Sequence, residues 1–172
     1  MIPKIRSILY CTDLSKNSAY AFRYAINTAQ KHDADIYILY VIEEIPEYFK
    51  TMLERYANNK RLHEAEKQRK GESIDRIKKR LEEVCRRELA NEPESLKDVK
   101  KIEVCEGYPA EEILKKADEF DCDIIIMGTH SKGAVSHTFL GSVAQRVLRH
   151  VRKPVFIIPL PEGETDISLK DM

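Results

Sequence analysis

Short apolar segments alternate along the chain with longer segments in which apolar residues recur every three or four positions. The apolar segments cover residues 5–11, 35–42, 100–106, 123–128 and 154–160, and their length and β-branched content are typical of strands. The second, fourth and fifth are nearly continuous in apolar residues, as in parallel strands that are covered on both faces. This alternation predicts an α/β fold with a parallel sheet and right-handed crossovers.

Three of the predicted helices have recognisable starts. Ser15 is expected to cap a helix that runs to about residue 32. Pro109 suits the first position of a helix that follows the third strand, and Gly141 with Ser142 opens the last helix. The first helix should bury one apolar stripe, formed by Ala19, Phe22, Ala25, Ile26 and Ala29.

The segment at about residues 47–90 is longer than a single crossover requires. Two apolar stripes lie in it, separated by the polar stretch NNKRLHEAEKQRKGES at residues 58–73, which has a glycine near its end. We expect two helical pieces there, joined by a solvated connection. The whole chain of 172 residues fits one domain, with the core in residues 1–161 and a polar tail at 162–172.

Charge and cysteine content narrow the class of protein. The 29 Lys and Arg balance the 29 Asp and Glu, so net charge gives no reason to expect nucleic acid or an anionic membrane. The apolar segments are much shorter than the roughly 18 residues of a membrane-spanning helix, and the first residues lack a signal-peptide pattern. The four cysteines form no CxxC pair, which argues against a zinc site or a disulfide framework. We expect a cytoplasmic protein without nucleic-acid binding or membrane insertion.

The candidate binding positions are the ends of the first, second and fourth strands, because ligands of open α/β sheets bind at the carboxyl ends of the strands. The second strand ends in Tyr40-Val41-Ile42. Asp13 ends the first strand, and its carboxylate either accepts hydrogen bonds from a ribose diol or caps the next helix. Gly128 ends the fourth strand and allows a close approach of phosphate. The amides after Gly141, those of Ser142 and Val143, begin a helix and suit an anion, although Ser142 is equally consistent with an ordinary N-cap.

Motifs of several enzyme classes are missing from the sequence. GTHSKGAV lacks the Lys-Ser/Thr of a P-loop, no G-x-G-x-x-G follows the first strand, and no G-x-S-x-G elbow occurs. His130 and His137 have no acidic or cysteine partner at metal spacing, so a surface position or a phosphate contact is expected for His130. No residue stands out as a general base. We expect a protein that is not an enzyme, with slow hydrolysis of a magnesium-bound triphosphate left open.

Two stretches resemble the universal stress protein family. One is the end of the first strand with Asp13, Ser15 and Ser18, and the other is IIIMGTHSKG…LGSVAQRVLRHVRKPVFIIP. The resemblance covers about the whole chain except the enlarged segment. It implies an open five-stranded parallel sheet in the order 3-2-1-4-5 with helices on both faces, a Rossmann-like fold related to adenine-nucleotide alpha-hydrolases. It also implies a homodimer that pairs the last strand, here PVFIIPL at residues 154–160, which suits an apolar edge.

Many members of that family bind ATP or AMP through the signature G-x2-G-x9-G-[S/T]. Matched by position, Gly128 is its first glycine, and Gly141 and Ser142 are its final pair. The second glycine falls on Ser131. If this position needs a positive φ, a serine costs about 1–2 kcal/mol, or about tenfold in affinity. The serine hydroxyl or Lys132 could instead supply a phosphate contact.

The resemblance also assigns positions around the base and leads to the functional prediction. It makes Asp13 the ribose- or adenine-side ligand, Val41 a wall against the adenine ring, and Thr12 a backbone contact beside the base. We predict a regulatory homodimer of the stress response that binds ATP or AMP, with Mg²⁺ accompanying the triphosphate. The alternative is a nucleotide-independent interaction module of the same fold, with the segment at residues 47–90 as the surface for an unknown protein partner.

Overall fold

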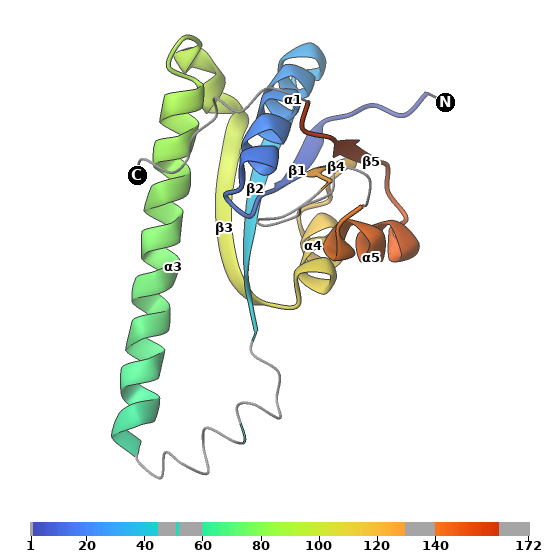
Figure 1. The fold of residues 1–172 in the computed structure, drawn as a ribbon. Helices are drawn as coiled ribbons and strands as arrows, with labels where there is room; N and C mark the ends of the chain where they lie inside the picture. Colours follow the sequence, from blue (N-terminus) through green and yellow to red (C-terminus); the bar gives the residue numbers. More distant parts are fainter. Residues whose placement is uncertain (1, 45–50, 52–59, 130–139, 162–172) are drawn as a thin grey trace.

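Five parallel strands form one sheet in the computed structural model, which describes residues 2–44, 51, 60–129 and 140–161 (Figure 1). The strand order is β3-β2-β1-β4-β5, which confirms the predicted fold and order. Each strand lies within two residues, at either end, of the segment predicted from the sequence. The elements in chain order are β1 (Ser7–Cys11), α1 (Lys16–His32), β2 (Asp35–Glu43), α3 (Lys60–Glu88), a 3-10 helix (Pro93–Asp98), β3 (Val99–Gly107), α4 (Pro109–Glu119), β4 (Ile124–Gly128), α5 (Ser142–His150) and β5 (Val155–Ile158).

The connections place a topological switch point between β1 and β4. The chain leaves β1 toward β2 and β3 on one side, and then crosses to β4 and β5 on the other side. Ile8 of β1 pairs with both Ile36 of β2 and Ile124 of β4 in the same direction, so all three strands end at one edge of the sheet. A ligand site of an open α/β sheet is expected at this edge, beside the switch point.

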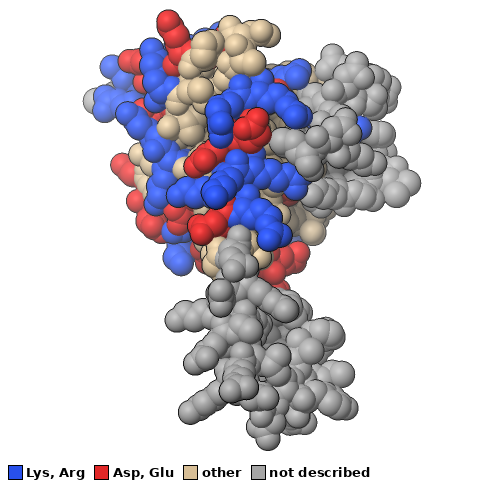
Figure 2. Space-filling view, turned by 90° about the vertical axis from the view of Figure 1, so that its left-hand side faces the viewer, with Lys and Arg blue, Asp and Glu red and all other residues tan. Residues whose placement is uncertain are grey.

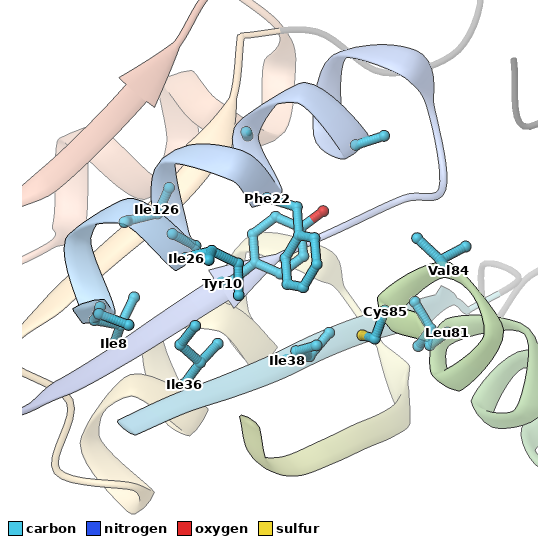
Figure 3. Close-up of a cluster of buried hydrophobic side chains, with 14 of the residues drawn as sticks. Ile8, Tyr10, Phe22, Ile26, Ile36, Ile38, Leu81, Val84, Cys85 and Ile126 are labelled. Atoms are coloured by element: carbon cyan, nitrogen blue, oxygen red, sulfur yellow. The ribbon is translucent and has the colours of Figure 1, made fainter. Parts of the chain in front are cut away.

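Helices cover both faces of the sheet and bury two separate cores. Helices α1 and α3 pack on one face, where strand residues such as Ile8 and Ile38 meet Phe22 of α1 and Leu81 of α3 (Figure 3). Helices α4 and α5 pack on the other face, around Ile125 and neighbouring strand residues. No helix within the described residues is both long and apolar enough to span a membrane.

Helix α1 follows the sequence prediction closely. Ser15 is its N-cap, and the Ser15 hydroxyl oxygen accepts a hydrogen bond from the Ser18 amide at 3.2 Å. The five residues of the predicted apolar stripe are all buried. A local cap and a local periodicity are sufficient to define this helix, because both act within a few residues.

Helix α3 corrects the expectation for the enlarged segment. Residues 60–73 were expected to belong to a solvated connection, but the helix is continuous from Lys60 through Gly71 to Glu88. Lys, Arg, Glu and Gln, which dominate this stretch, are good helix formers, and one glycine costs only about 1 kcal/mol. The first expected helical piece, at about residues 47–57, lies outside the described residues apart from Thr51.

Helix α3 is fixed to the body through its C-terminal half. Leu81, Val84 and Cys85 are buried against the sheet and α1. Toward Lys60 the helix extends past the carboxyl ends of β2 and β3 (Figure 1). Figure 2 shows the outer side of the C-terminal half of α3, where Lys and Arg side chains gather with acidic side chains between them. The exposed basic residues on the described part of α3 include Arg76, Lys78, Lys79, Arg86 and Arg87.

Candidate functional site

A cavity of about 340 Å³ lies at the carboxyl edge of the sheet, between the ends of β1, β2 and β4 and the first turns of α4 and α5. Its volume is within the range of small-molecule sites, about 300–1,000 Å³. Two of the nine predicted site residues, His130 and Ser131, lie outside the described residues. The other seven all line the cavity: Thr12, Asp13, Val41, Gly128, Gly141, Ser142 and Val143.

The two carboxylate oxygens of Asp13 differ in their hydrogen bonding within the described residues. Its Oδ1 accepts a hydrogen bond from the Ser15 amide at 2.9 Å and holds the turn that leads into α1. Its Oδ2 is buried, and no group among the described residues hydrogen-bonds to it. The N-cap of α1 is Ser15, and Asp13 supports this cap only through its Oδ1, which leaves Oδ2 for another partner. A buried charged oxygen without a donor is costly, and a ligand hydroxyl or amine would supply that donor.

The turn around Asp13 is held by short-range hydrogen bonds. The Thr12 hydroxyl accepts from the Leu14 amide at 3.1 Å and donates to Ser18 Oγ at 3.0 Å. Leu14 has a φ of 60°, a left-handed conformation that is unfavourable for leucine, and its side chain is buried. The Thr12 amide already donates to the Leu39 carbonyl at 3.0 Å. A backbone contact from Thr12 to a base would therefore have to use its carbonyl.

The start of α5 supplies hydrogen-bond donors to the cavity, in contrast to the Asp13 carboxylate, which is an acceptor. Gly141 is the N-cap, with φ −61° and ψ 155°, and its carbonyl accepts from the Gln145 amide at 2.9 Å. Ser142 is the first helical residue, so the interpretation of Ser142 as the N-cap is wrong. The first amides of a helix have no acceptor within it, and those of Ser142 and Val143 belong to residues that line the cavity. This arrangement favours an anion.

The absence of a side chain at Gly128 is required by packing, a reason that the sequence did not reveal. A Cβ atom at this position would lie 2.5 Å from Asn17 Oδ1 and 2.8 Å from Asn17 Cγ, too close for any real contact. Among the described glycines only Gly107 has a positive φ, so Gly128 does not use glycine's left-handed freedom. The missing side chain makes room for Asn17, while the backbone of Gly128 still lines the cavity.

Asn17 is the functional candidate that the sequence analysis missed. It is 6% exposed and polar, and it lies in the first turn of α1. Ala21 and Ala25, four and eight positions later, are fully buried on the same helix face. A polar residue in line with a buried stripe was the available signal, because such a residue must find hydrogen-bond partners inside the protein.

The remaining wall of the cavity is largely apolar. Leu39, Pro109, Ile113 and Met127 contribute to it, together with Val41. These residues suit the flat apolar face of an aromatic base.

Cys11 and Tyr40 also line the cavity and carry a thiol and a phenol that could act as nucleophiles if they ionised. Burial raises the pKa of the Cys11 thiol, and burial with the nearby Asp13 carboxylate raises the pKa of the Tyr40 hydroxyl. Both groups therefore remain neutral at pH 7, and neither is an activated nucleophile. Within the described part of the chain no group of three or more His, Cys, Asp or Glu side chains is arranged to hold a metal ion.

Comparison with known proteins gives one consistent family. The profile of the Universal stress protein family matches residues 4–159. Universal stress protein MJ0531 of Methanocaldococcus jannaschii is 32% identical over 160 residues, which are 92% of this chain and 85% of that protein. Universal stress protein MJ0577 of the same organism is 30% identical over 157 residues, or 89% of this chain and 94% of that protein.

Solved structures agree with the sequence comparison. The structure of MJ0577 superposes with a TM-score of 0.64 at 27% identity and covers 94% of this chain and 100% of that chain. A universal stress protein solved in complex with cAMP has the same fold, with a TM-score of 0.56 at 17% identity, covering 91% of this chain and 98% of that chain. With its sheet order, its cavity at the switch point and these relatives, the chain belongs to the universal stress protein family.

Proposed function

We propose that this protein binds an adenine nucleotide, AMP or ATP, in the cavity at the carboxyl edge of the sheet. The observation that carries the proposal is the buried Asp13 Oδ2, which has no donor among the described residues. It lies in one cavity with the first residues of α5, whose amides have no acceptor within the helix. A nucleotide matches both features, because its ribose diol donates hydrogen bonds and its phosphate accepts them. The cAMP complex of a protein with this fold supports the same class of ligand.

Each part of the nucleotide has a matching part of the cavity. Asp13 receives the ribose hydroxyls or an adenine-side donor, and the apolar wall with Val41 packs against the base. The amides that follow Gly141 bind phosphate. When ATP is the ligand, Mg²⁺ is held chiefly by the phosphate oxygens, since this cation binds substrate phosphates and retains several waters.

The protein acts in this proposal as a cytoplasmic regulatory homodimer of the stress response and not as an enzyme. Nucleotide occupancy would change the population of two conformations by binding one of them more tightly. Neither Cys11 nor Tyr40 can attack a phosphate in its neutral form. A phosphate-release assay on the wild type tests for slow hydrolysis.

The test begins with the wild-type protein and its natural ligand. Mass spectrometry of the small molecules released on denaturation should identify an adenine nucleotide. Isothermal titration calorimetry with AMP and ATP should then show binding to the stripped protein. If no nucleotide is released and millimolar AMP and ATP leave the melting temperature unchanged, the proposal is wrong, because a ligand of the native state must stabilise it.

Asp13→Asn provides the site-specific test. The variant can still accept the Ser15 amide through Oδ1, but it loses the charge at the position of Oδ2. We expect an affinity loss of about 10- to 100-fold, since hydrogen bonds to charged groups contribute about 1.5–3 kcal/mol. Asp33→Asn is the matched control. Asp33 ends α1 in a left-handed conformation with φ 52°, which asparagine tolerates, and it is not among the cavity residues.

The homodimer is proposed to form through β5, which is an edge strand of the described sheet. Phe156 on this strand is 40% exposed, and an apolar edge of this kind favours pairing with a second copy. Phe156→Glu should convert a dimer to a monomer in sedimentation equilibrium. Tyr24→Glu, at an equally exposed aromatic residue on α1, should leave the dimer intact. A monomeric wild type would contradict the proposal.

The nucleotide-independent interaction module remains the second candidate. The exposed basic side chains of α3 favour it, since they offer a charged surface for a partner. Release of near-stoichiometric nucleotide from the purified protein would exclude this candidate. Absence of nucleotide together with no thermal shift would favour it.

A further inference from the structure

Asn17 connects the cavity edge to the last strand through its side chain. Its Nδ2 donates a hydrogen bond to the Ile158 carbonyl at 3.0 Å. Its Oδ1 accepts a hydrogen bond from the Thr129 hydroxyl at 3.2 Å. These partners are 141 and 112 positions away in sequence, so one buried amide ties the first turn of α1 to the ends of β4 and β5.

Backbone hydrogen bonds complete the connection. The Gly141 amide donates to the Thr129 carbonyl at 2.8 Å, and the Thr129 amide donates to the Ile158 carbonyl at 3.2 Å. The start of α5, the end of β4 and the end of β5 therefore form one hydrogen-bonded series. The Asn17 side-chain amide hydrogen-bonds to two members of this series, Thr129 in its middle and Ile158 at its end.

Asn17 itself does not belong to the cavity wall, whereas Gly128, Thr129 and Gly141 do. An effect of Asn17 on a ligand must therefore pass through these neighbours. Buried hydrogen-bonded groups leave few alternative positions, because breaking any one of the bonds would leave an unsatisfied polar atom. A phosphate that restrains the first turn of α5 should consequently restrain Thr129 and Ile158.

We infer that Asn17 is a positioning residue that couples occupancy of the cavity to the ordering of the edge strand β5. This inference rests on the proposed binding of an adenine nucleotide. Coupling of this kind is reciprocal, so whatever orders β5, including a second copy of the chain, should raise nucleotide affinity by the same factor. The ligand site and the exposed edge would then be regulated together.

Amide hydrogen exchange with and without saturating AMP or ATP tests the coupling. In the wild type, the nucleotide should slow exchange at Gly141, Thr129 and the amides of β5, by about fivefold or more at β5 if the coupling is of ordinary size. In Asn17→Ala, the nucleotide should still slow exchange at Gly141, and its effect on β5 should be lost. Asn27→Ala, the same substitution at an exposed position of α1, should behave like the wild type.

Two further variants keep the test independent of the folding of Asn17→Ala. Asn17→Asp retains an acceptor for Thr129 but loses the donor to Ile158. Thr129→Val removes the hydroxyl while keeping the shape of the side chain. Both should reduce the response of β5 at saturating nucleotide. If Asn17 had only a structural role, its replacement would speed amide exchange at Gly141 and at β5, both with and without nucleotide. The nucleotide-dependent change at β5 would then persist.

Calorimetry on the same samples separates the two proposals. Binding of AMP or ATP to the wild type without any change of exchange at β5 overturns the coupling and leaves the proposed function intact. Absence of binding to the wild type overturns both. Binding with a response of β5 that Asn17→Ala retains in full also overturns the assignment to Asn17.

Discussion

Gly71 and Gly128 differ in how closely other residues pack around them. A Cβ atom at Gly71, inside α3, would meet nothing within 4 Å. A Cβ atom at Gly128, at the end of β4, would collide with the side chain of Asn17. Gly71 occupies an exposed position of α3, and Gly128 makes room for a buried amide that joins three elements.

The comparison shows that a glycine in a sequence does not reveal what its missing side chain permits. Gly71 lies in the stretch that was expected to be a solvated connection, and the helix passes through it. Gly128 is expected to allow a close approach of phosphate, and the structure adds that its missing side chain makes room for Asn17. In both cases the neighbours in space determine the function of the glycine. The predictions below test how firmly each region is held.

The largest effect is expected where α3 is attached to the body. Leu81→Ala removes a side chain that is 2% exposed and should lower the free energy of unfolding by about 2–5 kcal/mol. Urea denaturation measures this value. Lys78→Ala, at an exposed position of the same helix, should change stability by less than about 0.5 kcal/mol. Equal effects of the two variants would contradict the packing of α3 through this side.

Gly128→Ala should destabilise the protein by about 1–3 kcal/mol, the usual cost of overpacking. Because the collision is with Asn17, the double variant with Asn17→Ala should lose much less than the sum of the two single variants. A coupling energy of about 0.5–3 kcal/mol is expected for residues in direct contact. Additive losses in a double-mutant cycle would show that another neighbour limits Gly128.

Ser15→Ala should lower stability by about 1 kcal/mol, because it removes the N-cap of the helix that carries Asn17. The loss should appear in urea denaturation together with faster amide exchange in the first turn of α1. An unchanged midpoint of denaturation would indicate that the packing of α1 alone determines where the helix begins.

Gly71→Ala should have the smallest effect and the opposite sign to Gly128→Ala. Alanine in an open helical position should stabilise the protein by about 0.5–1 kcal/mol, since it restricts the unfolded chain and favours the helix. Far-UV circular dichroism should show no loss of helix. A decrease in stability would instead support a break in α3 at this position.

The sequence predicted those features that depend on neighbours along the chain. The apolar segment at residues 35–42 became β2, at Asp35–Glu43, and the Ser15 cap with its apolar stripe became α1. The site residues Asp13 and Ser142 were also predictable, because parallel strands bring their carboxyl ends to one edge. Pro109 and Ile113 also line the cavity and were not predicted, because they reach it only through the packing of α4 against the sheet.

The sequence by itself therefore determined the strands, the Ser15 cap of α1, the family and the chemical types at the cavity edge. Tertiary structure alone decided that Asn17 lies against Gly128 and bonds to Thr129, 112 positions away. It also decided that only one oxygen of Asp13 is satisfied within the described protein. The physical reason is the separation along the chain over which each interaction acts. Caps and periodicity are set within one or two turns of chain, whereas a buried amide finds its partners only after separate elements have packed together.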